Sequence, residues 1–135
     1  MDIAQFFVEA GRVLKDEAKI TIVLGRESNV RSVSFKNSEL ISAIACEGMG
    51  YEFTEWNERK FINRFGKLIY EDVLTMIPQK YALDKATGIG RAVGTQALRN
   101  ALEYCPTERR EEISDAIASA NKITPSPLIG DLVSG

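Results

Sequence analysis

Four of nine consecutive residues are basic in a segment that begins just after the only tryptophan of the chain. Lys60, Arg64 and Lys67 recur at steps of four and three, and Trp56 lies one helical turn before them. On a helix this spacing places the cations on one face with an aromatic ring at its end, a pattern typical of nucleic-acid contact. Acidic residues share the segment, and Glu71 lies four residues from Lys67, so a solvated helix face with ordinary ion pairs is the alternative interpretation.

The first functional hypothesis is an exposed basic face that meets an anionic partner, either nucleic acid or an acidic protein. We expect this face to combine Lys60, Arg64, Lys67, Arg91 and Arg99. The formal net charge of the whole chain is −2, which argues against a protein dedicated to coating nucleic acid. The sequence therefore favours a local basic surface on an otherwise acidic protein.

A glycine-rich stretch is the second candidate site. Gly88, Gly90 and Gly94 surround Arg91, and glycines allow a backbone to approach an anion that a guanidinium also binds. The spacing is GxGxxxG rather than GxGxxG, no strand is expected before it, and no GK[ST] follows it. The alternative function is thus a small-molecule-binding protein with an anion or phosphate pocket formed by Gly88, Gly90, Arg91 and Gly94.

The sequence contains no histidine, which bears directly on catalysis. Histidine is the commonest general base and a frequent metal ligand, and both Ser-His-Asp and Cys-His catalysis require it. We recognise no catalytic constellation, no metal site and no cofactor motif, so we expect a non-catalytic protein. An enzyme that uses Arg, Tyr, Cys or carboxylates is a third hypothesis. Cys46 and Cys105 lie far apart and are expected to be free thiols in a reducing compartment, the alternative being a disulfide.

Length and composition indicate one ordinary globular domain. The chain has 135 residues, of which 44% are hydrophobic and 27% are charged. We expect a compact domain over residues 1–123 and an extended or disordered C-terminal arm over 124–135. No apolar run reaches 18 residues and the N-terminus does not resemble a signal peptide, so we expect a cytoplasmic protein without a membrane partner.

The predicted fold class is α+β, predominantly helical, with about five helices and one β-hairpin between the first and second helices. The hairpin is expected within residues 19–36, with RESN as its loop. Apolar periodicity predicts the helices at residues 2–17, 38–47, 55–76, 80–104 and 106–121. We also expect self-association, in which the hairpin edge or the C-terminal arm joins copies into a homo-oligomer.

The helix expected over 80–104 carries a row of small residues on one face. Its members are Ala82, Ala86, Gly90, Gly94, Ala97 and Ala101. Because glycine within a helix costs about 0.5–1 kcal/mol relative to alanine, close packing of another backbone on this face is the expected compensation. A break in the helix near Gly88 is the alternative.

Overall fold

Two antiparallel sheets and four α-helices make up the part of the chain that the structure, a computed structural model, describes, which is residues 1–127. The larger sheet has the strand order β1-β5-β4, formed by β1 (Ile20–Gly25), β4 (Glu52–Ile62) and β5 (Leu68–Ile77). The smaller sheet pairs β2 (Glu27–Val30) with β3 (Val33–Lys36). The mixed α+β character is confirmed, but the predicted arrangement of about five helices and one hairpin is wrong.

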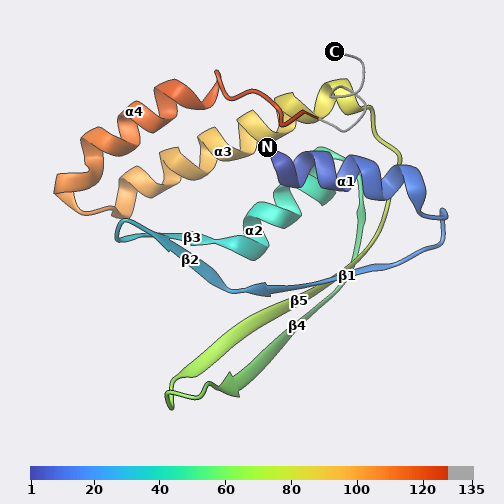
Figure 1. The fold of residues 1–135 in the computed structure, drawn as a ribbon, viewed down its shortest axis with the longest axis horizontal. Helices are drawn as coiled ribbons and strands as arrows, with labels where there is room; N and C mark the ends of the chain where they lie inside the picture. Colours follow the sequence, from blue (N-terminus) through green and yellow to red (C-terminus); the bar gives the residue numbers. More distant parts are fainter. Residues whose placement is uncertain (128–135) are drawn as a thin grey trace.

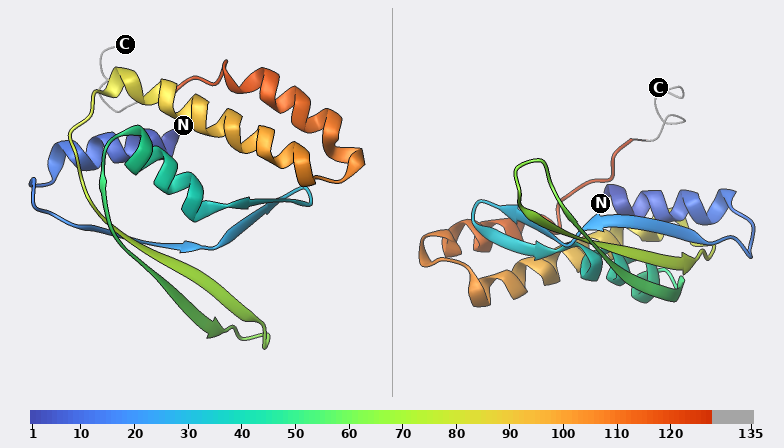
Figure 2. Two further views of the ribbon diagram at one scale, coloured as in Figure 1. Left: turned by 180° about the vertical axis from the view of Figure 1, so that it is seen from behind. Right: turned by 90° about the horizontal axis from the view of Figure 1, so that it is seen from below.

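The helices gather on one side of the larger sheet, and the β4–β5 hairpin extends away from them (Figures 1 and 2). They are α1 (Asp2–Val13), α2 (Asn37–Ser42), α3 (Leu83–Tyr104) and α4 (Arg110–Ala120). A π-helical turn η1 (Ala43–Gly48) continues α2, and a 3-10 turn η2 (Thr107–Arg109) precedes α4. Four of the five predicted helical ranges therefore contain a helix.

The predicted helix over residues 55–76 is the main error, because this segment forms strands β4 and β5. The chain reverses direction between Asn63 and Lys67, where the Asn63 side chain accepts hydrogen bonds from the N–H groups of Phe65 and Lys67. Gly66 has a φ of +76°, a left-handed conformation that interrupts a helix and suits glycine. β4 and β5 pair with each other along the hairpin, and β5 from Glu71 to Met76 also pairs with β1, about 50 residues earlier in the chain.

The predicted hairpin over residues 19–36 is present only in part. β1 pairs with β5, from Ile20 opposite Met76 to Gly25 opposite Glu71. The RESN segment, expected to be a loop, continues into strand β2, and the turn lies at Arg31 and Ser32 instead, both with positive φ. The hairpin between the first two helices is therefore the short β2–β3 pair.

The main core lies between the larger sheet and helices α1, α2, η1 and α3. Phe7 of α1 is fully buried against this sheet, whose Leu74 and Met76 alternate with partly exposed neighbours along β5. Tyr51 donates a hydrogen bond to the carbonyl of Phe7 and stacks edge-on against its ring. A second cluster joins β3, α3 and α4 through Val33, Ala101 and Ile113.

Helix α3 runs without a break through its glycines. Close packing on the small-residue face occurs at Gly90, where an added Cβ would lie 3.3 Å from the Cα of Met1. At Gly94 an added Cβ would meet no atom within 4 Å, so no backbone lies against this glycine in the described structure. Ala86 and Ala101 are buried, whereas Ala82 is exposed. The small-residue face is thus covered in patches rather than along its whole length.

The segment that follows α4 returns to the first helix as far as residue 127. Ser126 donates a hydrogen bond to Asp2 over 2.8 Å and accepts one from Gln5 over 2.9 Å. The first part of the predicted C-terminal arm is therefore tied to α1. The apolar residues Leu128, Ile129, Leu132 and Val133, which belong to the same predicted arm, lie outside the described residues.

Candidate functional site

The outer half of the β4–β5 hairpin is a two-stranded ribbon that the rest of the sheet does not support. β1 ends at Gly25, opposite Glu71, and the N–H of Arg26 makes a last hydrogen bond to the carbonyl of Tyr70. Beyond that point β5 pairs only with β4, which is exposed at every residue and forms a free edge of the sheet. We call residues 59–70 the hairpin end (Figure 1).

The hairpin end has a charge opposite to that of the rest of the chain. It contains Arg59, Lys60, Arg64 and Lys67 and no acidic residue, a formal charge of +4. The net charge of −2 for the whole chain therefore leaves −6 for all other residues. This distribution concentrates positive potential on the projecting ribbon.

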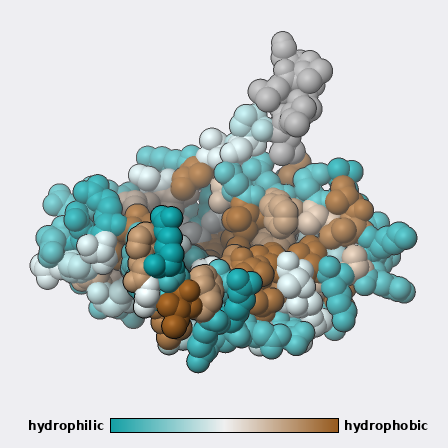
Figure 3. All heavy atoms as spheres, turned by 60° about the horizontal axis from the view of Figure 1, so that its bottom comes forward, coloured by the Kyte–Doolittle hydropathy of each residue, from teal (hydrophilic) through white to brown (hydrophobic). Residues whose placement is uncertain are grey.

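Large apolar side chains are unusually exposed along the same hairpin. The exposed fraction reaches 78% for Phe65, 70% for Ile62 and 55% for Trp56. In the space-filling view hydrophobic groups gather on this side of the molecule and alternate with hydrophilic ones (Figure 3). The remaining exposed large apolar residues of the hairpin are Phe53, Phe61, Leu68 and Tyr70. An exposed apolar surface of this kind indicates an interaction site.

Cations and aromatic rings lie next to one another on the hairpin end. The guanidinium of Arg64 lies 4.7 Å from the ring centroid of Phe65, and that of Arg59 lies 5.4 Å from the centroid of Phe61. Because directly paired residues share a face of the ribbon, Lys60 stands beside Tyr70 on the face that continues the core side. Phe61 is opposite Ile69 on the other face. Both faces of the ribbon therefore present cationic and apolar groups.

Two of the four cations of the hairpin end are engaged by acidic neighbours. Arg59 pairs with Glu71 over 3.2 Å, and Lys60 pairs with Glu58 over 3.2 Å. Arg64 and Lys67 form no ion pair with any residue in the described range 1–127. These two are therefore the cations best placed to meet an external anion.

The structure brings together three of the five predicted partner-binding residues. Lys60, Arg64 and Lys67 share the hairpin end, whereas Arg91 and Arg99 lie on α3, a separate element. Arg91 donates a hydrogen bond from Nε to the carbonyl of Ile123 over 2.9 Å, and Arg99 is exposed.

Sequence reasoning missed the exposed rings of the hairpin end, because a helix over 55–76 would have buried Phe61 and Phe65 on its inner face. The turn sequence Asn63-Arg64-Phe65-Gly66 was the signal that could have revealed the hairpin.

The alternative glycine-rich site lies inside a continuous helix. α3 begins at Leu83, so the N–H groups of Gly88, Gly90 and Gly94 fall within the helix rather than at its free N-terminal end. Gly90, Arg91 and Gly94 line a cavity of about 250 Å³ between α3 and α4, and Gly88 does not. The anion-pocket hypothesis remains a prediction that this geometry does not strengthen.

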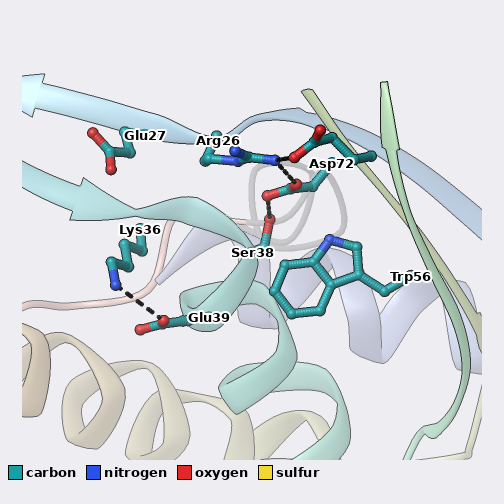
Figure 4. Close-up of a pocket in the computed structure, with 8 residues that line it drawn as sticks. Arg26, Glu27, Lys36, Ser38, Glu39, Trp56 and Asp72 are labelled. Atoms are coloured by element: carbon teal, nitrogen blue, oxygen red, sulfur yellow. Dashed lines mark hydrogen bonds and ion pairs between the residues drawn. The ribbon is translucent and has the colours of Figure 1, made fainter. Parts of the chain in front are cut away.

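The base of the hairpin is held by a buried carboxylate. Asp72 of β5 is 1% exposed and accepts a hydrogen bond of 2.6 Å from Ser38, in the first turn of α2. Arg26, at the junction of β1 and β2, lies 3.4 Å from Asp72 and also pairs with Glu58 of β4. The ring of Trp56 lies beside Ser38 and Asp72, and these side chains line a cavity of about 380 Å³ (Figure 4).

The neighbours of Asp72 determine its protonation. Burial is the largest single effect and would raise the pKa of this carboxyl, but hydrogen bonds from Ser38, Trp56 and Arg26, with the charge of Arg26, together lower it. The hydrogen bond with Arg26 likewise lowers the pKa of Glu58. Asp72 is therefore ionised at neutral pH and ties together α2, β5 and the β1–β2 junction, the elements from which the hairpin emerges.

Within residues 1–127, no group of three or more metal-ligating side chains could hold an ion. Cys46 and Cys105 are free thiols, and burial raises the pKa of Cys46, which disfavours the reactive thiolate. No helix in this range is long and apolar enough to cross a membrane.

Comparisons with protein families, with characterised proteins and with solved structures found no match.

Proposed function

We propose that this protein is a non-catalytic nucleic-acid-binding protein that uses the hairpin end, residues 59–70, to hold single-stranded nucleic acid. The observation that carries the proposal is a projecting ribbon with four cations, three aromatic residues and no acid. Phosphates attract cations through counterion release, and bases stack on exposed rings without regard to sequence. The proposed binding is therefore sequence-tolerant and sensitive to salt.

Arg64 and Lys67 take the phosphate contacts in this proposal, because neither forms an ion pair with a described residue. Phe65, at 78% exposure, offers the most exposed ring for a base, whereas the ring of Tyr70 is already contacted by Arg26 and Lys60. An acidic protein would also be attracted to the cations, but base stacking uses the rings as well. This combination favours nucleic acid over an acidic protein as the anionic partner. The free thiols fit the cytoplasm, which we include in the proposal.

The test is fluorescence anisotropy of labelled mixed-sequence oligonucleotides, single-stranded and duplex, over a series of salt concentrations. Each phosphate contact to a single strand contributes about 0.7 to the slope of log affinity against log salt, so the Arg64→Ala/Lys67→Ala variant should lose about 1.4. The Phe65→Ala variant should bind single strands about tenfold more weakly with an unchanged slope.

The matched control is the Lys80→Ala/Lys85→Ala variant, which also removes two exposed cations, outside the hairpin. It should bind like the unmodified protein. Absence of salt-dependent binding, or equal losses in the control and in the hairpin variant, would reject the proposed function. Binding to an acidic polypeptide in place of either oligonucleotide would assign the hairpin to an acidic protein.

A further inference from the structure

Three cavities with shared lining residues lie beside the base of the hairpin, between β4, the β2–β3 pair, α2 with η1, and α3, and we call them together the groove. Their volumes are about 380, 710 and 430 Å³, and Glu39 lines all three. The central cavity is walled by apolar groups that include Leu40, Phe53 and Val93, together with the small residues of α3. Phe53 and Trp56 of β4 border it on the side of the hairpin.

The groove is acidic as well as apolar. Its lining contains two basic residues, Arg26 and Lys36, and these five acidic residues: Glu27, Glu39, Glu47, Glu58 and Asp72. Its formal charge is therefore −3, and Glu47 forms no ion pair within residues 1–127. Glu39, Glu58 and Asp72 pair with Lys36 or Arg26, and Glu27 is a second lining acid that forms no ion pair within residues 1–127. A ligand with apolar and positively charged groups complements this lining.

We propose that the groove binds the hairpin end of a second copy of this chain. The hairpin end carries a formal charge of +4 and the most exposed large apolar side chains of the described residues, Phe65 and Ile62. It thus matches the groove in charge and in apolar character. The inference goes beyond the proposed function, because it needs no nucleic acid.

The occupant is a second copy because the hairpin of the same chain leads away from its own groove. Trp56 and Glu58 form part of the groove wall, and the ribbon continues outward from them (Figure 1). Because the hairpin end begins at Arg59, directly after Glu58, the paired ribbon cannot reverse onto the groove of its own chain. Hairpin and groove are separate surfaces on each copy, so two copies satisfy both by exchanging hairpins about a two-fold axis.

The test is the molar mass from light scattering during size-exclusion chromatography, in buffer without nucleic acid, over a concentration series. The unmodified protein should form a dimer. A hairpin-reversed variant, Arg64→Glu/Lys67→Glu, and a groove-reversed variant, Glu39→Lys/Glu47→Lys, should each weaken the dimer at least about tenfold, because like charges then meet. An equimolar mixture of the two variants should recover the dimer, since both contacts are again between opposite charges.

The Asp16→Lys/Glu17→Lys variant is the control, because it reverses two exposed acids outside the groove and should remain dimeric. Circular dichroism and thermal melting show whether each variant is folded. All four reversed side chains are exposed, so the substitutions should leave the fold intact. A monomeric unmodified protein, single variants that stay dimeric, or a mixture that stays monomeric would each overturn the inference.

Discussion

Replacing Asp72 should destabilise the protein more than replacing any exposed acid of the chain. Asp72 is 1% exposed, and its carboxylate accepts a hydrogen bond from the hydroxyl of Ser38, a residue that is itself 4% exposed. In the Asp72→Ala variant the Ser38 hydroxyl loses its partner while it stays buried, and Arg26 keeps only Glu58. A hydrogen bond to a charged group contributes about 1.5–3 kcal/mol, so we expect a loss of about 3 kcal/mol in the free energy of unfolding.

The contribution of the Ser38 contact can be isolated with a double-mutant cycle. Ser38→Ala removes the donor and should cost about 1.5–3 kcal/mol alone. The double variant Ser38→Ala/Asp72→Ala should lose clearly less stability than the sum of the losses of the two single variants. Either single change already abolishes the hydrogen bond between these side chains, so the second change has no such bond left to remove. Asp16→Ala is the control, since Asp16 is an exposed acid that lies outside the groove and forms no ion pair within residues 1–127.

The same carboxylate predicts a dependence of stability on pH. Because the pKa of Asp72 is lowered in the folded state, its stabilising contribution is fully present above the pKa of the unfolded chain, about 3.9, and is lost as the pH falls through the folded value. Asp72→Asn cannot titrate. The stability of this variant should therefore fall less steeply below about pH 4 than that of the unmodified protein.

Urea unfolding measures both effects, with circular dichroism and the fluorescence of Trp56 as two probes. The only tryptophan lines the same cavity, so its emission reports directly on this site. The reasoning would be refuted if Asp72→Ala cost less than 1 kcal/mol at pH 7. Parallel stability curves for Asp72→Asn and the unmodified protein below pH 4 would refute the assignment of the lowered pKa.

Three further predictions concern the glycines and the two proposed surfaces. Gly94→Ala should raise the free energy of unfolding by about 0.5–1 kcal/mol in urea denaturation, because an added Cβ meets no atom within 4 Å and alanine favours the helix; a loss would contradict the open space. Gly11→Ala should lower the free energy of unfolding by about 2 kcal/mol or more, since the added Cβ would lie 2.2 Å from the carbonyl oxygen of Gln79. A neutral effect would show that the contact between α1 and Gln79 relaxes. If both proposals hold, single-stranded oligonucleotide should compete for the hairpin end and convert the dimer into a complex with one protein chain, which light scattering would detect. A complex that keeps two chains would show that the two surfaces do not overlap.

The helices that can be predicted from the sequence are those with a regular pattern of residues along the helix itself. The predicted ranges 2–17, 38–47, 80–104 and 106–121 each contain an observed helix, with ends that differ by a few residues. The helix over 80–104 was also expected either to continue or to break near Gly88, and it continues from Leu83 to Tyr104. Its glycines were expected to mark close packing, but only Gly90 lies against another backbone while Gly94 faces open space. The small-residue pattern therefore predicted the helix more accurately than it predicted which parts of the chain pack against that helix.

Residues 55–76 show what local pattern leaves open. Their apolar residues fit a helical repeat, while Asp72, Leu74 and Met76 also fit the period of two of a strand. The strands are held by pairing of β5 with β4 and with β1, where Ile20 lies opposite Met76, and no local repeat encodes the pairing with β1. The position of Asp72 could not be anticipated either, because Arg26, Ser38 and Asp72 come from three distant segments.

The sequence by itself determined three features. They are the absence of any histidine for chemistry, the helices with strong periodicity, and the cluster of cations and aromatic residues around positions 59–70. Only the tertiary structure decided that this cluster lies on a projecting ribbon, that its rings face solvent, and that an acidic groove lies beside its base. The physical reason is that composition and local repeats depend on neighbouring residues, whereas exposure and charge complementarity depend on which distant strands pair.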